Sequence, residues 1–584
     1  MVTRVAVIDR DICIEKRCGY VCIKVCPPNR MGEECIVVEK DGIFPVISEP
    51  LCIGCGLCVK KCPVQCISII NLAQELSDPI YQYGINTFRL YGLPLPMEGG
   101  AVSLVGKNGI GKTSAIKLLT RQIKPNFANF ERELREEEVM AKLGLETRRY
   151  FTKTKEGMKV SVKPQHIDRV RDAFKGTVRE LLSGVGGAGR VAETAEKFRL
   201  AQILDRGLDK LSGGELQKVS VAAAWMKDAD IYYFDEITNY LDIEERLRMA
   251  VIIKELSERK SVMMAEHDLT FLDYVSSYVY LLYGDENVYG IVSGVKNVRV
   301  GINEYIAGFL KDENVRFRDY EIAFSRHSEG ELKAPALVKY GAMDKKYSGF
   351  AFSSEQGEIK KGEILGLVGK NALGKSTFVK MLAGVENADA GERLSMKVSY
   401  KPQYITAEPV LVSEIFAGKE LDNAVFEECK RKLNVGILME KKADELSGGE
   451  LQRVALTLAL SQRADIYLFD EPSAFLDIEQ RFEFAALLRK VISESDRSAF
   501  VVDHDIVFVD AIANRLIVFD GEGSVRGHAS APLNKKDGMN GFLKVAGITM
   551  RRDKDSARPR INKPGSQLDT EQRAAGEYFY FERK

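Results

Sequence analysis

The chain has 584 residues, of which 45% are hydrophobic, and its formal net charge is zero at pH 7. This length is ample for several hydrophobic cores and indicates about three or four domains. The balanced charge excludes binding of nucleic acid through bulk charge, so such a partner would have to meet local basic patches. The sequence shows no run of about 18 uncharged apolar residues, and its start lacks the features of a secretion signal. We therefore expect a cytoplasmic protein without a membrane partner.

A cysteine-rich segment near the start of the chain predicts iron–sulfur clusters. Ten of the eleven cysteines lie within residues 13–66. The run from Cys52 to Pro63 has the C-x₂-C-x₂-C-x₃-C-P spacing of bacterial ferredoxins, and a looser version runs from Cys13 to Pro27. In two-cluster ferredoxins the fourth cysteine of each run binds the other cluster. The predicted 4Fe–4S ligands are therefore, for one cluster, Cys13, Cys18, Cys22 and Cys62 and, for the other, Cys26, Cys52, Cys55 and Cys58.

Two cysteines of this segment, Cys35 and Cys66, remain outside both ligand sets, and we interpret them as non-ligands. Zinc is the main alternative, because four cysteines also suit it, but the spacing favours iron–sulfur clusters. A disulfide-rich domain is disfavoured, because the rest of the chain handles nucleotides and no signal sequence is seen. The ligands do not decide whether the clusters carry electrons or brace the fold.

An internal repeat organises the remainder of the chain. The segment GKNGIGKT at 106–113 returns as GKNALGKS at 369–376, and LSGGELQ at 211–217 returns at 446–452. The spacing of the motifs shows that the first copy carries about 25 extra residues near 125–155. There the sequence FERELREEEVMAKLG predicts a charged helix that ends at Gly144. This insert is either a solvated surface hairpin of helices or a dedicated docking element.

These observations divide the chain into an N-terminal cysteine module, two ATPase domains and two connecting segments. The predicted α/β fold has two tandem P-loop ATPase domains of ABC type, with a ferredoxin-like domain before them. The last segment is locally basic, which is typical of a solvated or domain-bridging tail and also suits a nucleic-acid contact. The predicted boundaries are 1–75 for the module, 76–300 and 332–530 for the ATPase domains, and 301–331 and 531–584 for the connecting segments.

Each copy begins with an apolar strand that leads into G-x-x-x-x-G-K-[ST] and then a helix, the context that a phosphate-binding P-loop requires. The backbone N–H groups of the loop and the helix N-terminus face the phosphates. We expect Lys112 and Lys375 to reach the β- and γ-phosphates, and Thr113 and Ser376 to hold Mg²⁺. The ATP-binding residues predicted in the loops are Gly106, Asn108, Gly109, Gly111, Lys112, Thr113, Ser114, Gly369, Asn371, Gly374, Lys375, Ser376 and Thr377.

The segments IYYFDE at 231–236 and IYLFDE at 466–471 predict buried strands that end in two acids. The first acid of each pair, Asp235 or Asp470, is expected to bind Mg²⁺. The second, Glu236 or Glu471, is placed to polarise the attacking water. The alternative, a structural ion pair, is disfavoured because a P-loop accompanies each pair.

LSGGELQ resembles the signature motif of the ABC ATPases. In that family, this helix start contacts the γ-phosphate of the ATP that the opposite domain holds, which suits a glycine-rich helix N-terminus. His267 and His504 resemble the family's switch histidine, and Gln165 and Gln403 match its Q-loop glutamine, which also contacts the metal. The resemblance implies two composite sites, in which each P-loop faces the opposite signature residues, Ser447, Gly449 and Glu450 for the first site and Ser212, Gly214 and Glu215 for the second.

An aromatic residue before each P-loop is expected to stack on adenine. The candidates are Tyr83 or Phe88 in the first copy, and Tyr347 or Phe350 in the second, and each could equally belong to a core. The copies also differ at two places. Ile237 stands where the second copy has a proline, and Ala372 replaces the glycine at 109. These differences suggest unequal sites.

The combination of a two-cluster module with twin ABC domains resembles subfamily E of the ABC proteins, the RNase L inhibitor or ribosome-recycling family of archaea and eukaryotes. The resemblance covers nearly the whole chain, including LCIGCGLCVKKCP, EHDLTFLDYVSSYVYLLYG, VRVGINEYIAGFL and RPRINK. It implies that the insert is a helix-loop-helix that docks on the small ribosomal subunit and its rRNA. It also implies that the segments near 295–325 and 530–584 are hinge regions.

The resemblance further implies a mechanism of ribosome recycling. ATP closes the two domains, and closure moves the iron–sulfur module against a release factor or its stalled-ribosome relative, which splits the ribosome into subunits. Hydrolysis then reopens the clamp, because ATP favours the closed member of a two-state equilibrium. Initiation factors are a further class of partner to consider, and the sequence does not decide whether the protein acts in initiation. We expect the protein to act as a monomer.

Three other functions compete with this interpretation. A transporter's ATPase subunit would share the nucleotide motifs but would rarely carry a ferredoxin module. A redox enzyme that couples ATP to electron transfer would need an acceptor or substrate pocket, and no motif indicates one. A pure scaffold would lack Glu236 and Glu471, yet both are present.

Overall fold

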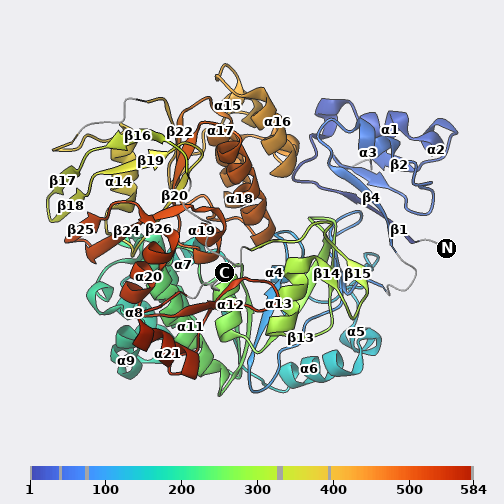
Figure 1. The fold of residues 1–584 in the computed structure, drawn as a ribbon. Helices are drawn as coiled ribbons and strands as arrows, with labels where there is room; N and C mark the ends of the chain where they lie inside the picture. The colour runs from blue at the N-terminus through green and yellow to red at the C-terminus, as the bar shows by residue number, and fades with distance from the viewer. Residues whose placement is uncertain (1–2, 39–41, 73–77, 325–332, 392–395, 580–584) are drawn as a thin grey trace.

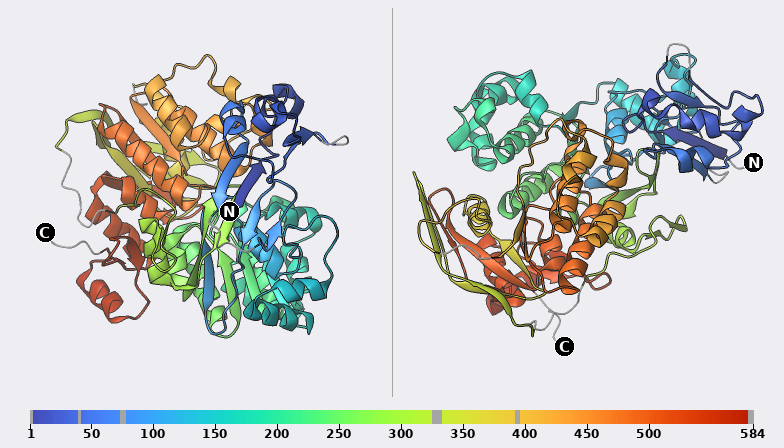
Figure 2. Two further views of the ribbon diagram at one scale, coloured as in Figure 1. Left: turned by 90° about the vertical axis from the view of Figure 1, so that its right-hand side faces the viewer. Right: turned by 90° about the horizontal axis from the view of Figure 1, so that it is seen from above.

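The computed structural model describes residues 3–38, 42–72, 78–324, 333–391 and 396–579. It is an α/β structure in which two similar nine-stranded sheets carry the two repeat copies (Figure 1). The N-terminal module lies at one end of the molecule (Figure 2, right). The boundaries predicted at 75/76 and 331/332 lie outside the described residues.

The N-terminal module is a small two-layer unit. Strand β1 (Thr3–Ile8) pairs antiparallel with β4 (Ile67–Leu72), and β2 (Ile36–Val38) pairs with β3 (Pro45–Ile47). The helices are short, because each cysteine run ends in Cys-Pro and extended backbone. They are α1 (Val21–Val25), α2 (Pro27–Arg30), α3 (Leu57–Lys61) and a 3₁₀ turn at Glu15–Cys18. Buried cysteines and aliphatic side chains share one core.

The first ATPase domain is built on a sheet whose central strands are parallel. The strand order is β5-β6-β12-β11-β7-β10-β9-β8, and β13 pairs with β11. Because both faces of the central strands are covered, they read as continuous apolar runs. The strands are β5 (Tyr81–Gln82), β6 (Arg89–Tyr91), β7 (Ala101–Val105), β8 (Val160–Lys163), β9 (Ile231–Asp235), β10 (Ser261–Ala265), β11 (Tyr278–Asp285), β12 (Tyr289–Val292) and β13 (Lys296–Asn297).

The second ATPase domain repeats this sheet strand for strand. Its order is β17-β18-β25-β24-β20-β23-β22-β21, and β26 pairs with β24. A separate antiparallel pair joins β16 (Ala336–Tyr340) to β19 (Gly357–Lys360). The strands of the main sheet are β17 (Met343–Tyr347), β18 (Phe350–Ser354), β20 (Ile364–Val368), β21 (Val398–Lys401), β22 (Ile466–Asp470), β23 (Ser498–Val502), β24 (Arg515–Glu522), β25 (Arg526–Ala529) and β26 (Leu533–Asn534).

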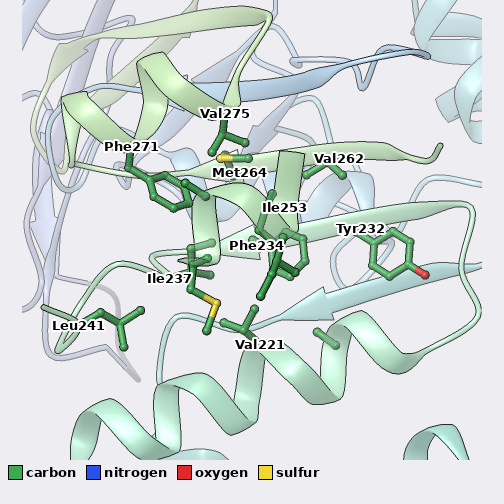
Figure 3. Close-up of a cluster of buried hydrophobic side chains, with 14 of the residues drawn as sticks. Val221, Tyr232, Phe234, Ile237, Leu241, Ile253, Val262, Met264, Phe271 and Val275 are labelled. Carbon is green, nitrogen blue, oxygen red and sulfur yellow. The ribbon is translucent and has the colours of Figure 1, made fainter. Parts of the chain in front are cut away.

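Helices cover the sheets, and several of them begin at a side chain that caps their free N–H groups. Ser212 and Ser447 form capping boxes with Glu215 and Glu450. Figure 3 shows the core in which β9 and β10 pack against α10 and its neighbours. The helices of the first domain are α4 (Lys112–Leu119), α7 (Asp168–Ala173), α8 (Val178–Gly186), α9 (Val191–Lys197), α10 (Gly213–Met226), α11 (Ile243–Ser257) and α12 (Leu269–Val275). Those of the second are α14 (Lys375–Leu382), α15 (Val412–Phe416), α16 (Asn423–Lys432), α17 (Gly448–Ser461), α18 (Ile478–Ser493) and α19 (Ile506–Ile512).

The insert of the first copy contains two helices, α5 (Glu136–Lys142) and α6 (Leu145–Lys155). The helix predicted from Phe130 begins only at Glu136, where the Glu138 carboxylate accepts the Arg135 N–H over 2.9 Å. Gly144 lies at the N-terminus of α6 rather than merely ending the first helix. The Tyr150 hydroxyl donates to the Leu119 carbonyl oxygen over 2.8 Å, which fixes α6 to the end of α4.

The two connecting segments contain a second repeat that the sequence analysis did not identify. In the first segment, α13 (Val298–Ala307) is followed by a hairpin of β14 (Phe309–Leu310) and β15 (Val315–Arg316). In the second segment, α20 (Lys535–Ala546) is followed by β27 (Met550–Arg552), β28 (Pro559–Ile561) and α21 (Gln567–Ala575). The boundary expected at 300 falls inside α13, and β26 belongs to the second sheet although it follows residue 530.

Each connecting segment docks on the opposite ATPase domain. In the first, Arg318 pairs with Glu479 of α18 at 3.1 Å, and the Tyr320 hydroxyl donates to Glu483. In the second, β28 packs against α12, and Arg560 bonds Asp273 there. The segments therefore strap the two halves together in a reciprocal way, and they also meet each other.

One asparagine anchors the N-terminal module to the first ATPase domain. Buried Asn86 donates from Nδ2 to the Ala6 carbonyl oxygen over 2.9 Å, and its Oδ1 accepts the Ile47 N–H over 2.8 Å. Its own carbonyl oxygen accepts the Ile8 N–H. An ion pair between Arg89 and Glu49 at 2.7 Å adds a second contact. In the described ranges, no helix has the length and apolar character needed to cross a membrane.

We predict that Asn86→Ala loosens this contact. An unsatisfied buried N–H costs about 1–3 kcal/mol, so the Ile47 amide should exchange its hydrogen about ten-fold faster or more. Hydrogen-exchange mass spectrometry of the full chain measures this change. Asn29→Ala is the matched control, because Asn29 makes the same two-bond contact with Ile36 inside the module. Unchanged exchange at Ile47 in Asn86→Ala would contradict the anchoring role.

Candidate active sites and iron–sulfur centres

The two P-loops have the same geometry. Lys112 Nζ donates to the carbonyl oxygens of Gly106 and Lys107 at 2.8 and 2.7 Å, so the loop wraps around its own ammonium. Lys375 does the same with Gly369 and Lys370. Both lysines are buried, and burial lowers their pKa values, that of Lys375 to about 8. Phosphate oxygens would replace these intraloop contacts when nucleotide binds.

Ala372 follows the same backbone path as Gly109, so this substitution does not distort the second loop. Their φ angles are +58° and +67°, both left-handed. A Cβ on Gly109 would approach Asn287 Oδ1 to 2.4 Å, which explains the glycine there. The Asn287 N–H donates to the Gly109 carbonyl oxygen. In the second copy the Ser524 N–H donates to the Ala372 carbonyl oxygen, and the smaller serine side chain stands where Asn287 stands in the first copy.

Carboxylates suited to Mg²⁺ stand behind both loops. The Thr113 hydroxyl donates to Asp235 Oδ2 over 2.8 Å, and in the second copy Ser376 lies beside Asp470. Burial raises the pKa of both aspartates, that of Asp235 to about 6. One carboxylate oxygen of Asp235 and both carboxylate oxygens of Asp470 are buried and accept no hydrogen bond from the described residues. Buried oxygens of this kind fit a cation that would complete their shell.

Glu236 and Glu471 follow these aspartates on strained backbone. Both have φ of +49°, a left-handed conformation that costs a non-glycine residue about 1–3 kcal/mol. Gln165 Nε2 donates to Glu236 Oε1 over 2.7 Å, and Gln403 Nε2 donates to Glu471 Oε1 over 2.8 Å. The predicted Q-loop glutamines thus hold the predicted catalytic carboxylates.

The surroundings of the two glutamates differ. Asn239 Nδ2 donates to Glu236 Oε2 over 2.8 Å, whereas Ala474 occupies the equivalent place beside Glu471. His504 Nε2 lies 3.4 Å from Glu471 Oε1, while His267 Nε2 lies 3.9 Å from Glu236 Oε1. The first glutamate therefore has one more amide donor, and the second has the closer imidazole.

Electrostatics also separate the two sites. Burial opposes ionisation of Glu471, but His504 and the charges of Lys375 and Lys401 outweigh it and lower its pKa. Burial, with the charges of Lys112 and Arg481, lowers the pKa of His267 well below its usual value. His267 is thus a neutral imidazole at physiological pH.

Two cavities contain residues from both halves of the chain. The first has a volume of about 690 Å³ and the second about 670 Å³. The first is lined by Tyr83, Phe88, Asn108, Gly109, Gly111, Lys112, Thr113, Ser114, Gln165, Glu236 and His267 on one side and by Ser447 and Gly449 on the other. The second is lined by Phe350, Asn371, Gly374, Lys375, Ser376, Thr377, Gln403, Glu471 and His504, opposite Ser212 and Gly214.

Some predicted residues stand outside these walls. Glu215 and Glu450 cap the signature helices through Ser212 and Ser447 and do not line these two cavities, but Glu450 lines an adjacent cavity with Asn108 and Gly109 of the opposite P-loop. Their contact with ATP stays a prediction. Gly106 and Gly369 pack instead against β11 and β24. Among the aromatic candidates, Tyr83 and Phe88 both line the first cavity.

In the second copy, Phe350 lines the cavity, but Tyr347 stacks on Phe350 at 6.2 Å and bonds Glu386 outside the wall.

Two aspartates that the motif search passed over connect the halves directly. Asp477 Oδ2 accepts the Asn108 N–H of the opposite P-loop over 3.0 Å, and Asp242 Oδ2 accepts the Asn371 N–H over 2.9 Å. The other oxygen of each aspartate caps its own helix, α18 or α11. The sequence held a signal for both aspartates, because a Leu-Asp pair follows each Asp-Glu pair at the same distance, at 241–242 and at 476–477.

The difference between Ile237 and Pro472 is compensated nearby. Glu266 accepts the N–H groups of Ile237 and Thr238. Proline has no N–H, and the shorter Asp503 needs to reach only the N–H and hydroxyl of Ser473. The longer side chain of Glu266 is therefore found in the copy where Ile237 provides an additional N–H donor.

The cysteines of the N-terminal module gather in two groups. One small cavity is lined by Cys13, Cys18, Cys22 and Cys62, together with Cys66, whose Sγ lies 3.5 Å from that of Cys62. In the other group, Cys58 lies within electrostatic range of Cys26, Cys52 and Cys55, and Cys35 contacts Cys26. None of these described cysteines forms a disulfide, and burial raises the pKa of Cys22 and Cys58 to about 11. Buried thiols of this kind fit iron, which would bind them as thiolates.

Family models match the three main parts of the chain. One described as ABC transporter matches residues 97–239 and 353–474. A possible Fer4-like domain in RNase L inhibitor matches 3–34, and a 4Fe–4S binding domain matches 45–68. ABC transporter E family member 1 of Arabidopsis thaliana is 40% identical, with 99% of each chain covered.

The chain belongs to subfamily E of the ABC proteins. It is therefore an ATPase of the ABC type with a 4Fe–4S-binding domain, as the resemblance implied. Translation initiation factor RLI1 of Saccharomyces cerevisiae is 39% identical, over 99% of this chain and 98% of its own. A solved structure described as ribosome-bound archaeal Pelota and ABCE1 aligns with a TM-score of 0.92 and 46% identity, over 99% of this chain and 100% of its own. The RNase-L Inhibitor structure gives 0.81 and 44%, over 86% and 100%.

We predict that Asp477→Asn weakens closure of this subfamily E protein at the first site. Asparagine keeps an acceptor for the α18 cap but removes the charge that binds the Asn108 N–H, a bond worth about 1.5–3 kcal/mol. The ratio of closed to open clamp at saturating ATP should fall about ten-fold, as measured by fluorescence transfer between the two ATPase domains. Asp422→Asn is the control, because Asp422 caps α16 within one domain. An equal loss in both variants would argue against the cross-domain contact.

Proposed function

We propose that this protein recycles ribosomes by an ATP-driven conformational change. The observation that carries the proposal is the match, over 99% of this chain and 100% of the other, to the ABCE1 chain of a ribosome-bound complex with Pelota. A second solved complex pairs an archaeal ribosome recycling factor with the ribosomal stalk protein aP1. The partners that we assign are the small ribosomal subunit with its rRNA, and a release factor or its stalled-ribosome relative. This activity would take place in the cytoplasm.

The nucleotide chemistry follows from the two composite cavities. In each, the P-loop lysine and N–H groups bind the phosphates, and the opposite signature helix start faces the γ-phosphate. Mg²⁺, held by Thr113 and Asp235 or by Ser376 and Asp470, would offset phosphate charge, with Gln165 or Gln403 nearby. Glu236 and Glu471 accept a proton from the attacking water. Neutral His267 can donate a hydrogen bond to the γ-phosphate.

ATP in either cavity contacts both halves, so it binds the closed arrangement more tightly than the open one. The N-terminal module is anchored to the first domain through Asn86, and its motion is therefore tied to that half. Closure supplies the force that separates the subunits, and hydrolysis resets the clamp. The helices α5 and α6 are the element that we assign to docking on the small subunit.

The splitting activity can be tested by sucrose-gradient sedimentation. Archaeal 70S ribosomes incubated with this protein, a release factor and ATP should separate into subunits. Glu236→Gln combined with Glu471→Gln should split one round and remain on the small subunit, because ATP stays unhydrolysed. Ribosomes that stay intact at every protein concentration would rule out recycling.

The cluster content can be tested by chemical analysis. Two 4Fe–4S clusters require about eight irons and eight sulfides per chain, with a brown absorbance band. Cys58→Ser should lose about half of the iron, whereas Cys35→Ser should keep it, because we place Cys35 outside the ligand sets. Stoichiometric zinc in place of iron would overturn the assignment.

A further inference from the structure

Two lysines lie directly behind the catalytic glutamates, and the mechanism above does not use them. Lys163 ends β8 and Lys401 ends β21, and their side chains are 0% and 1% exposed. Neither lines a nucleotide cavity. Fully buried ammonium groups are costly unless they are paired or hydrogen-bonded, so their retention in both copies calls for a physical reason.

Both ammonium groups bind backbone rather than carboxylates. Lys163 Nζ donates to the carbonyl oxygens of Asp235 and Glu236, each over 2.8 Å. Lys401 Nζ donates to those of Asp470 and Glu471 over 2.9 and 3.2 Å. These carbonyls flank the left-handed turn at which the strand ends and the glutamate leaves it. The lysine thus supplies donors where the sheet no longer offers N–H groups.

A second donor reaches the same carbonyl from the signature helix. Gln217 Nε2 of α10 donates to the Glu236 carbonyl oxygen over 2.7 Å, and Gln452 Nε2 of α17 donates to that of Glu471 over 2.9 Å. The glutamate's peptide is therefore held from two sides, while Gln165 or Gln403 holds its carboxylate. Three independent donors fix one residue in a conformation that it would otherwise avoid.

We propose that Lys163 and Lys401 are positioning residues for ATP hydrolysis, which hold the backbone of Glu236 and Glu471 so that each carboxylate faces the attacking water. The inference rests on the proposed role of these glutamates as bases. A carboxylate displaced by about 1 Å loses most of its catalytic effect, which is why backbone placement matters. Because the lysines stand outside the cavities, they act on turnover and not on ATP affinity.

The test is Lys163→Met combined with Lys401→Met in the full chain, with kcat, KM and ATP affinity measured separately. Methionine preserves length and removes the donor. We expect kcat to fall about 10- to 100-fold, as for other outer-shell partners, with KM and affinity changed less than about two-fold. Lys159→Met combined with Lys397→Met is the control, because these lysines precede the same strands but pair with Asp228 and Glu420 at the surface.

A double-mutant cycle separates positioning from general damage. In the Glu236→Gln, Glu471→Gln background, the lysine substitutions should cause no further loss of turnover. An additive loss, or an unchanged kcat in the lysine variant, would overturn the inference. If the glutamine background itself keeps full turnover, the proposed bases are wrong, and the inference falls with them for that separate reason.

A second variant covers the case in which the lysine variant does not fold. Gln452→Met leaves Lys401 in place and removes the other donor to the Glu471 carbonyl oxygen, together with the bond of the same amide to the Pro472 carbonyl oxygen. It should lower kcat with unchanged KM, and a normal kcat would contradict the idea that this peptide must be held.

Discussion

The two halves of this molecule depend on one reciprocal contact, in which an aspartate of each half accepts a backbone N–H of the opposite P-loop. Asp242 and Asp477 each use one oxygen to cap a helix of their own domain and the other to reach across. Burial opposes ionisation of Asp242, but the N–H donors of Glu245 and Asn371 outweigh it and lower its pKa. The contact therefore joins a rigid helix to the loop that holds phosphate, so occupancy of a site and alignment of the domains are physically linked.

The connecting segments support the same arrangement from outside. Each continues one domain and docks on the other, through Arg318 and Glu479 in one case and through Arg560 and Asp273 in the other. Asp553 receives bonds from both Arg560 and Asn303, so the two segments also meet. Two connecting segments with these contacts restrict how the halves separate.

The sequence predicted the motifs well because their chemistry is local. A P-loop, a signature helix start or a Cys-Pro run is set by neighbouring residues, and the structure brings the predicted members of both cavities together. It did not predict contacts made through backbone groups, such as those of Asp477, because an aspartate at a helix start already has a local explanation. The repeat in the connecting segments also escaped notice, since its similarity lies in element order rather than in a motif. The signature motif also did not show that its glutamates, Glu215 and Glu450, bind the serines at the start of their own helices.

The differences between the copies are more conservative than the sequence suggested. Ala372 keeps the backbone of Gly109, and Pro472 is matched by the shorter Asp503. The two sites still differ in the hydrogen bonds to the proposed catalytic carboxylate. Asn239 donates to Glu236, whereas Ala474 stands at the equivalent position beside Glu471. The two glutamates therefore lie in unequal surroundings.

Each signature helix belongs to two active sites at once. Helix α17 begins with Ser447 in the wall of the first cavity, and five residues later Gln452 holds the catalytic glutamate of the second. Helix α10 does the same in the opposite sense, through Ser212 and Gln217. A substitution in either helix can therefore affect both sites. The two signature helices thus make the two sites one mechanical unit.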